Sequence, residues 1–591
     1  MSILNWFYFL MLFPCFLFGN ILYHVEFHGV KNENVLDAIY KTSSLIQEQN
    51  KPVDTLSAIH YRLDLDINTI KKILKLYGYY DAIVSFEIAT ETRKNIIIAI
   101  YVSEGVRYTL DAYNIYVPPF NDKKLLPFKD QIPLKKLGLE LYQGTTTGHI
   151  VQAEYNLLDK LADLSYPLAS VEKREIIINT SKKTITVDQY VDPGSYCTFG
   201  PITIYGLKNI NPRFIEKKLA WKEHEPYSPQ KVEETQKRLL NTQLFTSVLL
   251  NHPDSTMPNS SELPMKITLE ESLHKNVSVG GSYGTVEGFG GLFTYKNNNL
   301  FNMGETLILE VEAAQRSYGG QLTFIKPDVV RLYQNYVCQL DILTQKIYVC
   351  HYQDYNIANR LDRRINDNTD FSLSIKAEYL NVTHSINNNN YFLLAAPLFL
   401  KFTTADQLLN PTQGWNCLYQ PSFYLVANKH KTTFLKQKLI TSFYWPILAN
   451  KTFIIAMNLQ MGSIASAPIQ DIPIPKLFFG GSEEDLRGYK YRTVSPLNKD
   501  GQPIGGRSAI FISLEPRIKL NEKLAIVPFG DFGIVQTCVY PNPIGKWYKS
   551  VGFGLRYFSF FGPLKIDIGF PLNRRSFDPH FRVYVNIGQT F

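Results

Sequence analysis

The sequence predicts two architectures in one chain: three small α+β domains, followed by an antiparallel transmembrane β-barrel of sixteen strands. Three observations predict this fold class. In the first half of the 591 residues, strand-like and helix-like segments alternate, and the pattern recurs three times. From residue 274 onward, apolar residues repeat with a period of two almost throughout. Charged residues make up only 19% of the chain and aromatic residues 13%, a composition expected of a membrane barrel.

The same composition excludes other classes of protein. After the N-terminus, the longest apolar runs, such as residues 96–102 and 391–400, are far shorter than the roughly 20 residues of a membrane helix. Disorder is excluded because 45% of the residues are hydrophobic and no low-complexity tract is present. The net charge of +8 is spread along the chain without a basic block, so nucleic acid is not an expected partner.

The N-terminus resembles a secretory signal, and we expect residues 1–19 to be removed on export. Residues 6–18 read WFYFLMLFPCFLF, an apolar run of suitable length. No Lys or Arg precedes the run, which departs from the usual signal, and a buried N-terminal segment is the alternative. Lipid attachment at Cys15 is disfavoured because Pro14 stands where a small residue is expected.

No catalytic or metal site is expected, so the chain is interpreted as a non-enzyme without cofactors. HExxH, GxSxG and Walker motifs are absent from the sequence, and the eleven His are scattered. The cysteines of the mature chain are odd in number and widely spaced, without a CxxC pair, which argues against zinc and against a disulfide framework. Isolated thiols are favoured over a pair between Cys338 and Cys350. These cysteines are Cys197, Cys338, Cys350, Cys417 and Cys538.

Each repeat in the first half follows the order β-α-α-β-β, over a length of roughly 75–90 residues that suffices for one small core. The first repeat opens with the alternating run 22–27, and Gly78 follows its second helix where a C-cap belongs. Helices are expected at 35–47, 67–77, 150–164, 212–219 and 229–240. The predicted limits are residues 20–105, 106–193 and 194–272 for the three domains, and 273–591 for the barrel.

In the second half, one face of each expected strand is apolar and the other carries glycine and charge. Residues 277–283, 551–557 and 564–570 show this alternation, which is the lipid-out and lumen-in pattern of a membrane barrel. A soluble sandwich shows the same period, but the signal and the aromatic residues near strand ends favour the membrane. The sixteen expected strands span 275–284, 287–296, 304–315, 317–326, 334–345, 346–357, 369–382, 390–402, 415–427, 431–444, 452–463, 507–519, 523–534, 547–558, 562–571 and 580–590.

The long connection between the eleventh and twelfth expected strands carries the most specific motif. Residues 477–489 read LFFGGSEEDLRGY, which resembles the FxGG…VRGY signature of the outer-membrane protein assembly family, the BamA/TamA superfamily. Leu486 stands where the family commonly has Val. In the first half, residues 78–82, 191–194 and 241–248 resemble phrases of POTRA domains, which are periplasmic modules that offer a sheet edge to client polypeptides.

The resemblance implies the residues of a functional site. The motif arginine is Arg487, and in the family it folds back into the barrel and pairs with acidic groups, whose positions here are Glu515 and Asp531. Glu515 alternates with apolar neighbours, so its lumen orientation also follows from the sequence. Asp531 shares parity with Val527 and Phe529, which leaves its orientation open. The alternative is an ordinary loop cation at Arg487. The motif also includes Gly480, Gly481, Gly488 and Tyr489.

The resemblance also implies a function in outer-membrane translocation and assembly. Three POTRA-like units resemble the TamA branch, whose members work with a TamB-like inner-membrane-anchored partner and with unfolded β-rich clients at the outer-membrane lipid bilayer. Clients would enter through a seam between the first and last strands, weakened by glycines. The alternatives are a two-partner secretion transporter, a passive pore or an adhesin, with the POTRA-like units as spacers. The predicted seam residues are Gly280, Gly281, Gly284 and the C-terminal Phe591.

Overall fold

The computed structural model describes residues 21–49, 51, 53, 55–92, 95–253, 261–284, 288–383, 388–407, 410–427, 431–559 and 562–587. The predicted signal at 1–19 and the seam residue Phe591 lie outside these ranges. The chain divides into two compact units, and the division passes through the third small domain. The first unit holds Met1–Thr203, Leu219–Gln236 and Leu250–Ile267, and the second holds Ile204–Lys218, Lys237–Leu249 and Thr268–Phe591. No helix in the described ranges is both long enough and apolar enough to cross a bilayer.

The first domain is a three-stranded sheet in the order β1-β3-β2, with β1 parallel to β3 and β2 antiparallel to it. Its long helix begins earlier than the sequence predicts, because Thr55 caps it and Ile59 and Leu63 extend the buried face. Asp66 on this helix is buried and accepts the backbone N–H groups of Ser44 and Leu45. A charged residue therefore stands on the buried face, where the sequence pattern expects an apolar one. The elements are β1 (Leu22–His28), α1 (Glu33–Thr42), α2 (Ser44–Gln47), α3 (Leu56–Leu76), β2 (Ile83–Thr92) and β3 (Asn95–Ser103).

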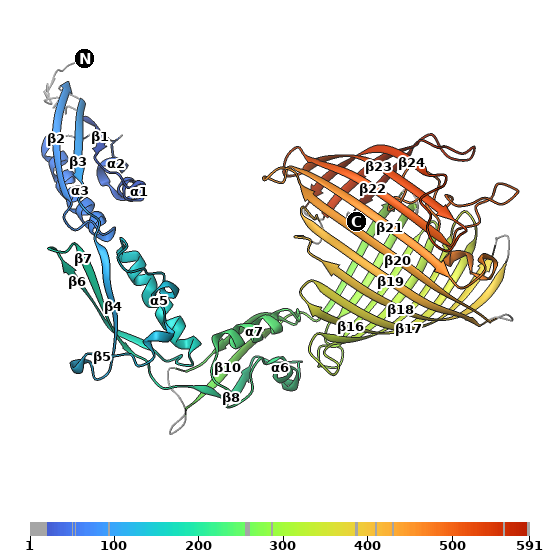
Figure 1. Ribbon diagram of the computed structural model, residues 1–591, viewed down its shortest axis with the longest axis horizontal. Coiled ribbons are helices and arrows are strands. Elements are labelled where there is room, and N and C mark those ends of the chain that lie inside the picture. Colours follow the sequence, from blue (N-terminus) through green and yellow to red (C-terminus); the bar gives the residue numbers. More distant parts are fainter. Residues whose placement is uncertain are drawn as a thin grey trace, which may run out of the picture. The chain divides into compact units, whose positions relative to one another are not determined.

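The second domain departs from the predicted β-α-α-β-β order. Its sheet has four strands in the order β5-β4-β7-β6, and α4 is a single turn, followed by the long α5 (Figure 1). Prolines at 118, 119, 127 and 133 supply no backbone N–H donor, and two 3-10 turns replace a longer first helix. The elements are β4 (Thr109–Val117), β5 (Lys124–Leu125), α4 (Leu134–Leu137), α5 (Thr147–Asp163), β6 (Ser170–Asn179) and β7 (Thr184–Asp192).

The third domain has the predicted order of elements, and its sheet runs β8-β10-β9. In the first and third domains, the turn after the opening strand is built in the same way. Gly29 and Gly206 have φ of +87° and +88°, and a Cβ on either would clash with a carbonyl of the last strand. A carboxylate at the end of that last strand, Glu104 or Glu271, then accepts backbone N–H groups of the turn. The elements are β8 (Thr198–Tyr205), α6 (Pro212–Lys218), α7 (Pro229–Leu240), β9 (Phe245–Asn251) and β10 (Glu262–Glu271).

The remainder forms one sixteen-stranded antiparallel sheet with neighbours in sequence order, which confirms the predicted barrel. The largest difference is β16, which continues to Asn366 because its backbone pairs with β15 as far as Arg363 and with β17 as far as Asn366. Within this stretch Arg360 Nε donates to Asp362 at 2.7 Å. The strands are β11 (Lys275–Gly284), β12 (Gly288–Asn297), β13 (Thr306–Ala314), β14 (Ser317–Lys326), β15 (Gln334–Lys346), β16 (His351–Asn366), β17 (Thr369–Thr383), β18 (Asn389–Thr403), β19 (Gly414–Ala427), β20 (Lys431–Pro446), β21 (Phe453–Ala465), β22 (Ser508–Lys519), β23 (Leu524–Gln536), β24 (Tyr548–Ser559), β25 (Gly562–Pro571) and β26 (Arg582–Ile587).

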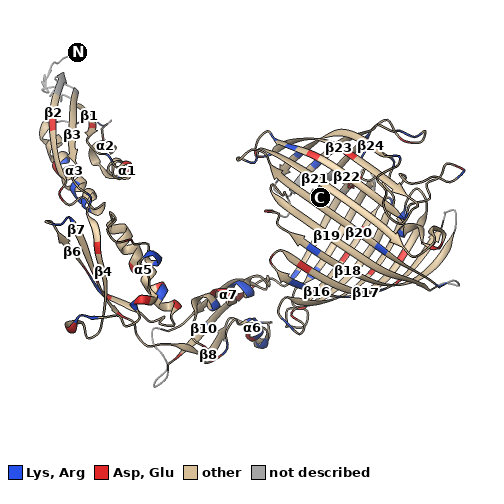
Figure 2. Cartoon of the chain, viewed as in Figure 1, with Lys and Arg blue, Asp and Glu red and all other residues tan. Residues whose placement is uncertain are grey.

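The two faces of the barrel wall differ as a membrane barrel requires. Outward-facing residues such as Ile375, Phe553 and Trp445 are exposed apolar side chains, while charged side chains such as Glu515 and Asp567 are buried on the inside. Figure 2 shows strands that are largely free of charge, with isolated charged positions along them. The alternation read from the sequence therefore separates lipid-facing from lumen-facing residues.

The first and last strands lie beside each other, yet no backbone ladder joins the described parts of β11 and β26. The described side chains of β11 from Lys275 to Gly281 are all exposed, on both faces of the strand. Every other pair of successive barrel strands is hydrogen bonded. This junction, which we call the seam, is therefore the weakest lateral contact in the described wall.

Candidate functional site: the loop inside the barrel

The connection between β21 and β22, residues 466–507, folds into the barrel and is called here the inner loop. Its two arms are joined by isolated bridges, Phe478 with Gly506 and Gly480 with Val494. Its apolar residues pack on inward-facing residues of the wall: Leu477 and Phe479 in one cluster, and Leu486 and Tyr489 in another. A cavity of about 540 Å³ remains beside the loop, lined by wall residues and by Asp485 and Arg492 among others.

Arg487 lies at the centre of this packing and is 1% exposed. All five guanidinium N–H groups have an acceptor. Nε and Nη2 donate to Asp531 at 2.8 Å each, Nη1 donates to Glu515 at 2.8 Å and to Asp567 at 3.1 Å, and Nη2 also donates to Ser513 at 3.0 Å. Bidentate pairing of this kind fixes orientation as well as charge. Arg487 therefore joins three strands of the wall: β22, β23 and β25.

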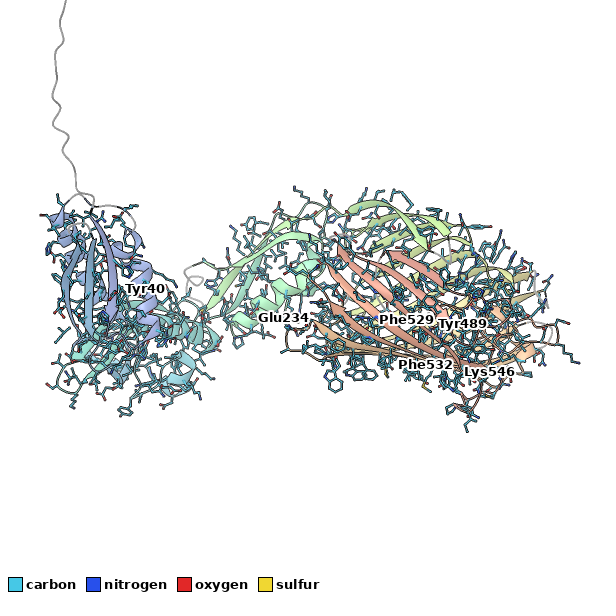
Figure 3. All side chains as sticks on the ribbon, turned by 90° about the horizontal axis from the view of Figure 1, so that it is seen from above. Tyr40, Glu234, Tyr489, Phe529, Phe532 and Lys546 are labelled. Carbon is cyan, nitrogen blue, oxygen red and sulfur yellow. The ribbon has the colours of Figure 1, made fainter. Side chains whose placement is uncertain are left out.

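The ring of Phe529 completes the surroundings, since the Arg487 Cζ lies 3.4 Å from its centroid. Phe529 lies on β23 and Tyr489 in the inner loop, and both are labelled in Figure 3. Stacking on an aromatic face stabilises a guanidinium, more so where water is excluded. Three further cations surround the same carboxylates: Arg517, Arg556 and Lys565.

The motif glycines are required by close backbone approach. Gly488 has φ of +90°, and a Cβ there would lie 3.0 Å from the nitrogen of Pro571 and 3.1 Å from Gly569. Gly481 has φ of +107°, and its Cβ would lie 2.3 Å from the carbonyl oxygen of Lys490. A Cβ on Gly480 would lie 2.6 Å from the ring of Phe511. Only glycine lets the inner loop lie against the wall at Gly480 and Gly488, and against its own backbone at Gly481.

Tyr489 extends the contact to β24 and to the loop after β25. Its hydroxyl donates to the carbonyl of Lys549 at 2.8 Å and accepts the N–H of Asn573 at 3.2 Å. Its ring meets Tyr548 edge-on at 5.6 Å. The buried hydroxyl is thus satisfied by two backbone groups, one on β24 and one in the loop after β25.

A second anchor holds the inner loop on a different part of the wall. Lys476 pairs with Glu378 of β17, whose side chain is fully buried. Lys376 lies 3.4 Å from the other oxygen of that carboxylate. Lys436 of β20 donates to the carbonyl of Lys476 at 2.8 Å. The inner loop is therefore fixed through Arg487 to β22, β23 and β25, and through Lys476 to β17 and β20.

The structure brings the predicted partners Glu515 and Asp531 together at Arg487. The open question of Asp531 is answered by its neighbours Val527 and Phe529, which also face inward and are buried. Sequence reasoning missed Asp567, although the alternation in residues 564–570 already placed it on the polar face. It also missed Ser513, Phe529 and the Lys476 anchor. Lys476 and Glu378 lie 98 residues apart and carry no motif, so no signal in a single sequence pairs them.

The predicted seam glycines Gly280, Gly281 and Gly284 lie on β11. A Cβ added to Gly280 or Gly281 would have no atom within 4 Å, so neither glycine is required by packing. Gly284 is the last residue of β11 and is aligned with Gly288 of β12. The five cysteines of the described chain are free, and no group of His, Cys, Asp and Glu there could hold a metal ion.

Comparison with known families agrees with this geometry. Residues 299–591 match the Omp85 superfamily domain, and residues 197–271 match the POTRA family, described as a surface antigen variable number repeat. The outer membrane protein assembly factor BamA of Nitratidesulfovibrio vulgaris is 23% identical over 558 residues, which is 90% of this chain and 68% of that protein. BamA of Neisseria meningitidis serogroup B is 22% identical over 599 residues, 89% of this chain and 72% of that protein.

The fold has a close counterpart among solved structures. The crystal structure of BamA from Haemophilus ducreyi lacking POTRA domains 1–3 superposes with a TM-score of 0.70 at 17% identity. The match covers 82% of this chain and all of that one. The chain therefore belongs to the Omp85 superfamily, as an outer-membrane β-barrel protein whose N-terminal POTRA domains lie in the periplasm.

Proposed function

We propose that this chain is a TamA-like translocation and assembly protein that passes client polypeptides sideways through the seam between β11 and β26. One observation carries the proposal: the inner loop occupies the lumen and is held at two anchors, whereas the seam has no described ladder. A client can therefore pass more easily through the side of the barrel, at the seam, than through the filled lumen. No chemical reaction is needed for this role.

Opening the lumen should cost more free energy than opening the seam. Withdrawing the inner loop would separate Arg487 from Asp531, Glu515 and Asp567 and leave the buried carboxylate of Asp531 without its bidentate partner, at a cost of about 3–5 kcal/mol. Opening the seam breaks no described backbone hydrogen bond between β11 and β26. An edge strand exposed in this way offers its N–H and C=O groups to an incoming strand.

The POTRA domains supply further edges. The end strands of the described sheets are β1 and β2 in the first domain, β5 and β6 in the second, and β8 and β9 in the third. An extended client segment can add to such an edge through backbone hydrogen bonds. The relatives named as assembly factors support a role in assembly, and three POTRA-like sheets support the TamA-like form with a TamB-like partner.

A disulfide across the seam tests the proposal. Cysteine pairs placed at residues 277–281 of β11 and 583–585 of β26, in a Cys538→Ser background, should close the seam when oxidised. The oxidised protein should lose client insertion into vesicles and regain it on reduction, while the same pairs left reduced serve as controls. Undiminished insertion by the oxidised protein would contradict the lateral route.

Channel recordings separate this function from the alternatives. A plugged assembly barrel should give small and fluctuating conductance, and a passive pore should give a large and steady one. Export of a single co-purifying substrate through the lumen, unaffected by the seam disulfide, would favour a secretion transporter.

A further inference from the structure

The last barrel strand contacts the motif of the inner loop directly. The N–H of Gly488 donates to the hydroxyl oxygen of Tyr584 on β26 at 2.8 Å, and Tyr584 is 1% exposed. Arg582 on the same strand donates through Nη1 to the carbonyl of Tyr489 at 3.3 Å. Two successive residues of the motif are thus bonded through their backbones to side chains of β26.

The connection leading into β26 is tied to the same loop. Arg575 donates to Asp578 through Nε at 2.6 Å and Nη2 at 2.8 Å, and its Nη1 donates to the carbonyl of Thr493 at 2.6 Å. Its Nη2 also reaches the hydroxyl of Thr493 at 2.9 Å. The connection between β25 and β26 is therefore fixed to the inner loop through Arg575 and Thr493.

These contacts matter because β26 has little other support. It pairs with β25 over six residues, Leu564–Gly569 against Arg582–Ile587, and with no described residue of β11. In that register Tyr584 lies opposite Asp567, the carboxylate that binds Arg487. The hydrogen bond between Gly488 and Tyr584 thus connects the buried cluster around Arg487 to β26, the strand at the seam.

We propose that Tyr584 is a positioning residue for the seam: its hydroxyl holds β26 against Gly488 and keeps the seam narrow until a client arrives. Arg582 adds a second bond to the same stretch of loop. The inference rests on the proposed function for its purpose, but the geometry that it predicts is measurable without any client. Arg487 stabilises the wall of β22, β23 and β25, whereas Tyr584 sets where the free edge of β26 lies.

Tyr584→Phe separates the positioning of β26 from the packing of the barrel. This variant keeps the buried ring and removes only the oxygen that accepts from Gly488, leaving that N–H without its partner. The loss of one such hydrogen bond should raise the population of the open seam about tenfold. Tyr557→Phe is the matched control, because Tyr557 is an outward-facing residue of β24 that is 44% exposed.

The experiment measures the width of the seam in the full-length protein in lipid vesicles. Spin labels are placed at Val279 of β11 and Val583 of β26 in a Cys538→Ser background, and the distribution of distances between them is recorded. Tyr584→Phe should lengthen and broaden this distribution and speed client insertion, while the temperature of barrel unfolding stays close to that of the parent. Tyr557→Phe should leave all three readouts unchanged.

Each outcome bears on one claim. A distance distribution in Tyr584→Phe that equals the parent's overturns the positioning role. A large fall in unfolding temperature with no change in distance shows a merely structural residue and also overturns it. A widened seam without any change in client insertion leaves the positioning role standing and contradicts the proposed lateral route instead.

Discussion

Arg487 and Asp531 form a buried bidentate pair in which the backbone of the arginine also takes part. Nε and Nη2 each donate at 2.8 Å to a different carboxylate oxygen, and the Arg487 N–H donates to Oδ2 at 3.1 Å. Both side chains are 1% exposed. One aspartate therefore fixes the position, the direction and the charge of the motif arginine.

Arg487→Ala should lower the free energy of barrel unfolding by about 3–5 kcal/mol, because it leaves the buried carboxylate of Asp531 without its bidentate partner. Arg487→Lys should recover only part of the loss, since an ammonium cannot reproduce the fork. Thermal unfolding of the protein in detergent measures both. Lys499→Ala, at an exposed cation of the same loop, is the control. A loss as small as that of the control would make Arg487 an ordinary loop cation.

Gly488→Ala and Gly501→Ala separate close packing from backbone strain. Both glycines lie in the inner loop with positive φ, +90° and +77°, but only a Cβ at Gly488 meets other atoms, since the space around Gly501 is open. Gly501→Ala should cost about 1 kcal/mol from its conformation alone. Gly488→Ala should cost at least about 2 kcal/mol more, because the loop must move away from Gly569. Equal unfolding temperatures for the two variants would refute the close approach.

The Lys476 anchor should be measurable by a double-mutant cycle. Glu378→Gln and Lys476→Met should each destabilise the barrel, and the double variant should lose less than the sum, with a coupling of about 1–3 kcal/mol. The single variants should also raise channel conductance, because one arm of the inner loop is released from β17. Lys346→Met, which removes a cation at the end of β15, serves as the control. Additive losses would show that the two side chains do not interact.

Glu271 should make the third POTRA domain sensitive to acid. Burial raises the pKa of Glu271, but hydrogen bonds from the backbone N–H groups of Lys208 and Asn209 and from His274 outweigh it, so the pKa lies below its ordinary value of 4.5. A lowered pKa contributes stability that is complete above the ordinary value and is lost as the pH falls through the value in the folded protein.

Amide hydrogen exchange of the full-length protein tests this prediction. The amides of Lys208, Asn209 and Ile210 should be protected near pH 7 and lose protection as the pH falls below about 4.5. Glu271→Gln should show weak protection at every pH. Glu270→Gln, at the exposed neighbour, should behave as the parent does. If the amides of residues 208–210 stay protected in Glu271→Gln, the carboxylate of Glu271 is not what protects them.

The barrel was the most predictable part of the fold, because lipid on one side and a polar lumen on the other impose a period of two on every strand. The count of sixteen and most strand limits followed from that period. β16 extends beyond the predicted end at residue 357, because the charged stretch from Arg360 to Arg364 lacks the apolar period although its backbone pairs with β15 and β17. In the second domain, prolines interrupt the helical period. The strand β5 has only two residues, too few for an alternating pattern to predict it.

At the site, the resemblance of residues 477–489 identified Arg487, and strand parity oriented Glu515. The parity rule was ambiguous for Asp531, because apolar Val527 and Phe529 face the packed inner loop and not the lipid. An inward face lined by a folded loop is partly apolar, so polarity alone does not mark it. Contacts such as Lys476 with Glu378 depend on the path of the loop through the barrel, which no local pattern records.

The buried carboxylate of β23 couples folding of the wall to entry of the inner loop. Glu515 and Asp567 also pair with cations of the wall itself, Arg517, Arg556 and Lys565. Asp531 is bound by Arg487, which precedes β23 in the chain. Burying Asp531 before Arg487 has entered the barrel would desolvate a charge without its bidentate partner. We therefore expect insertion of the inner loop to precede, or accompany, the burial of Asp531, and a folding intermediate would keep this part of the wall hydrated.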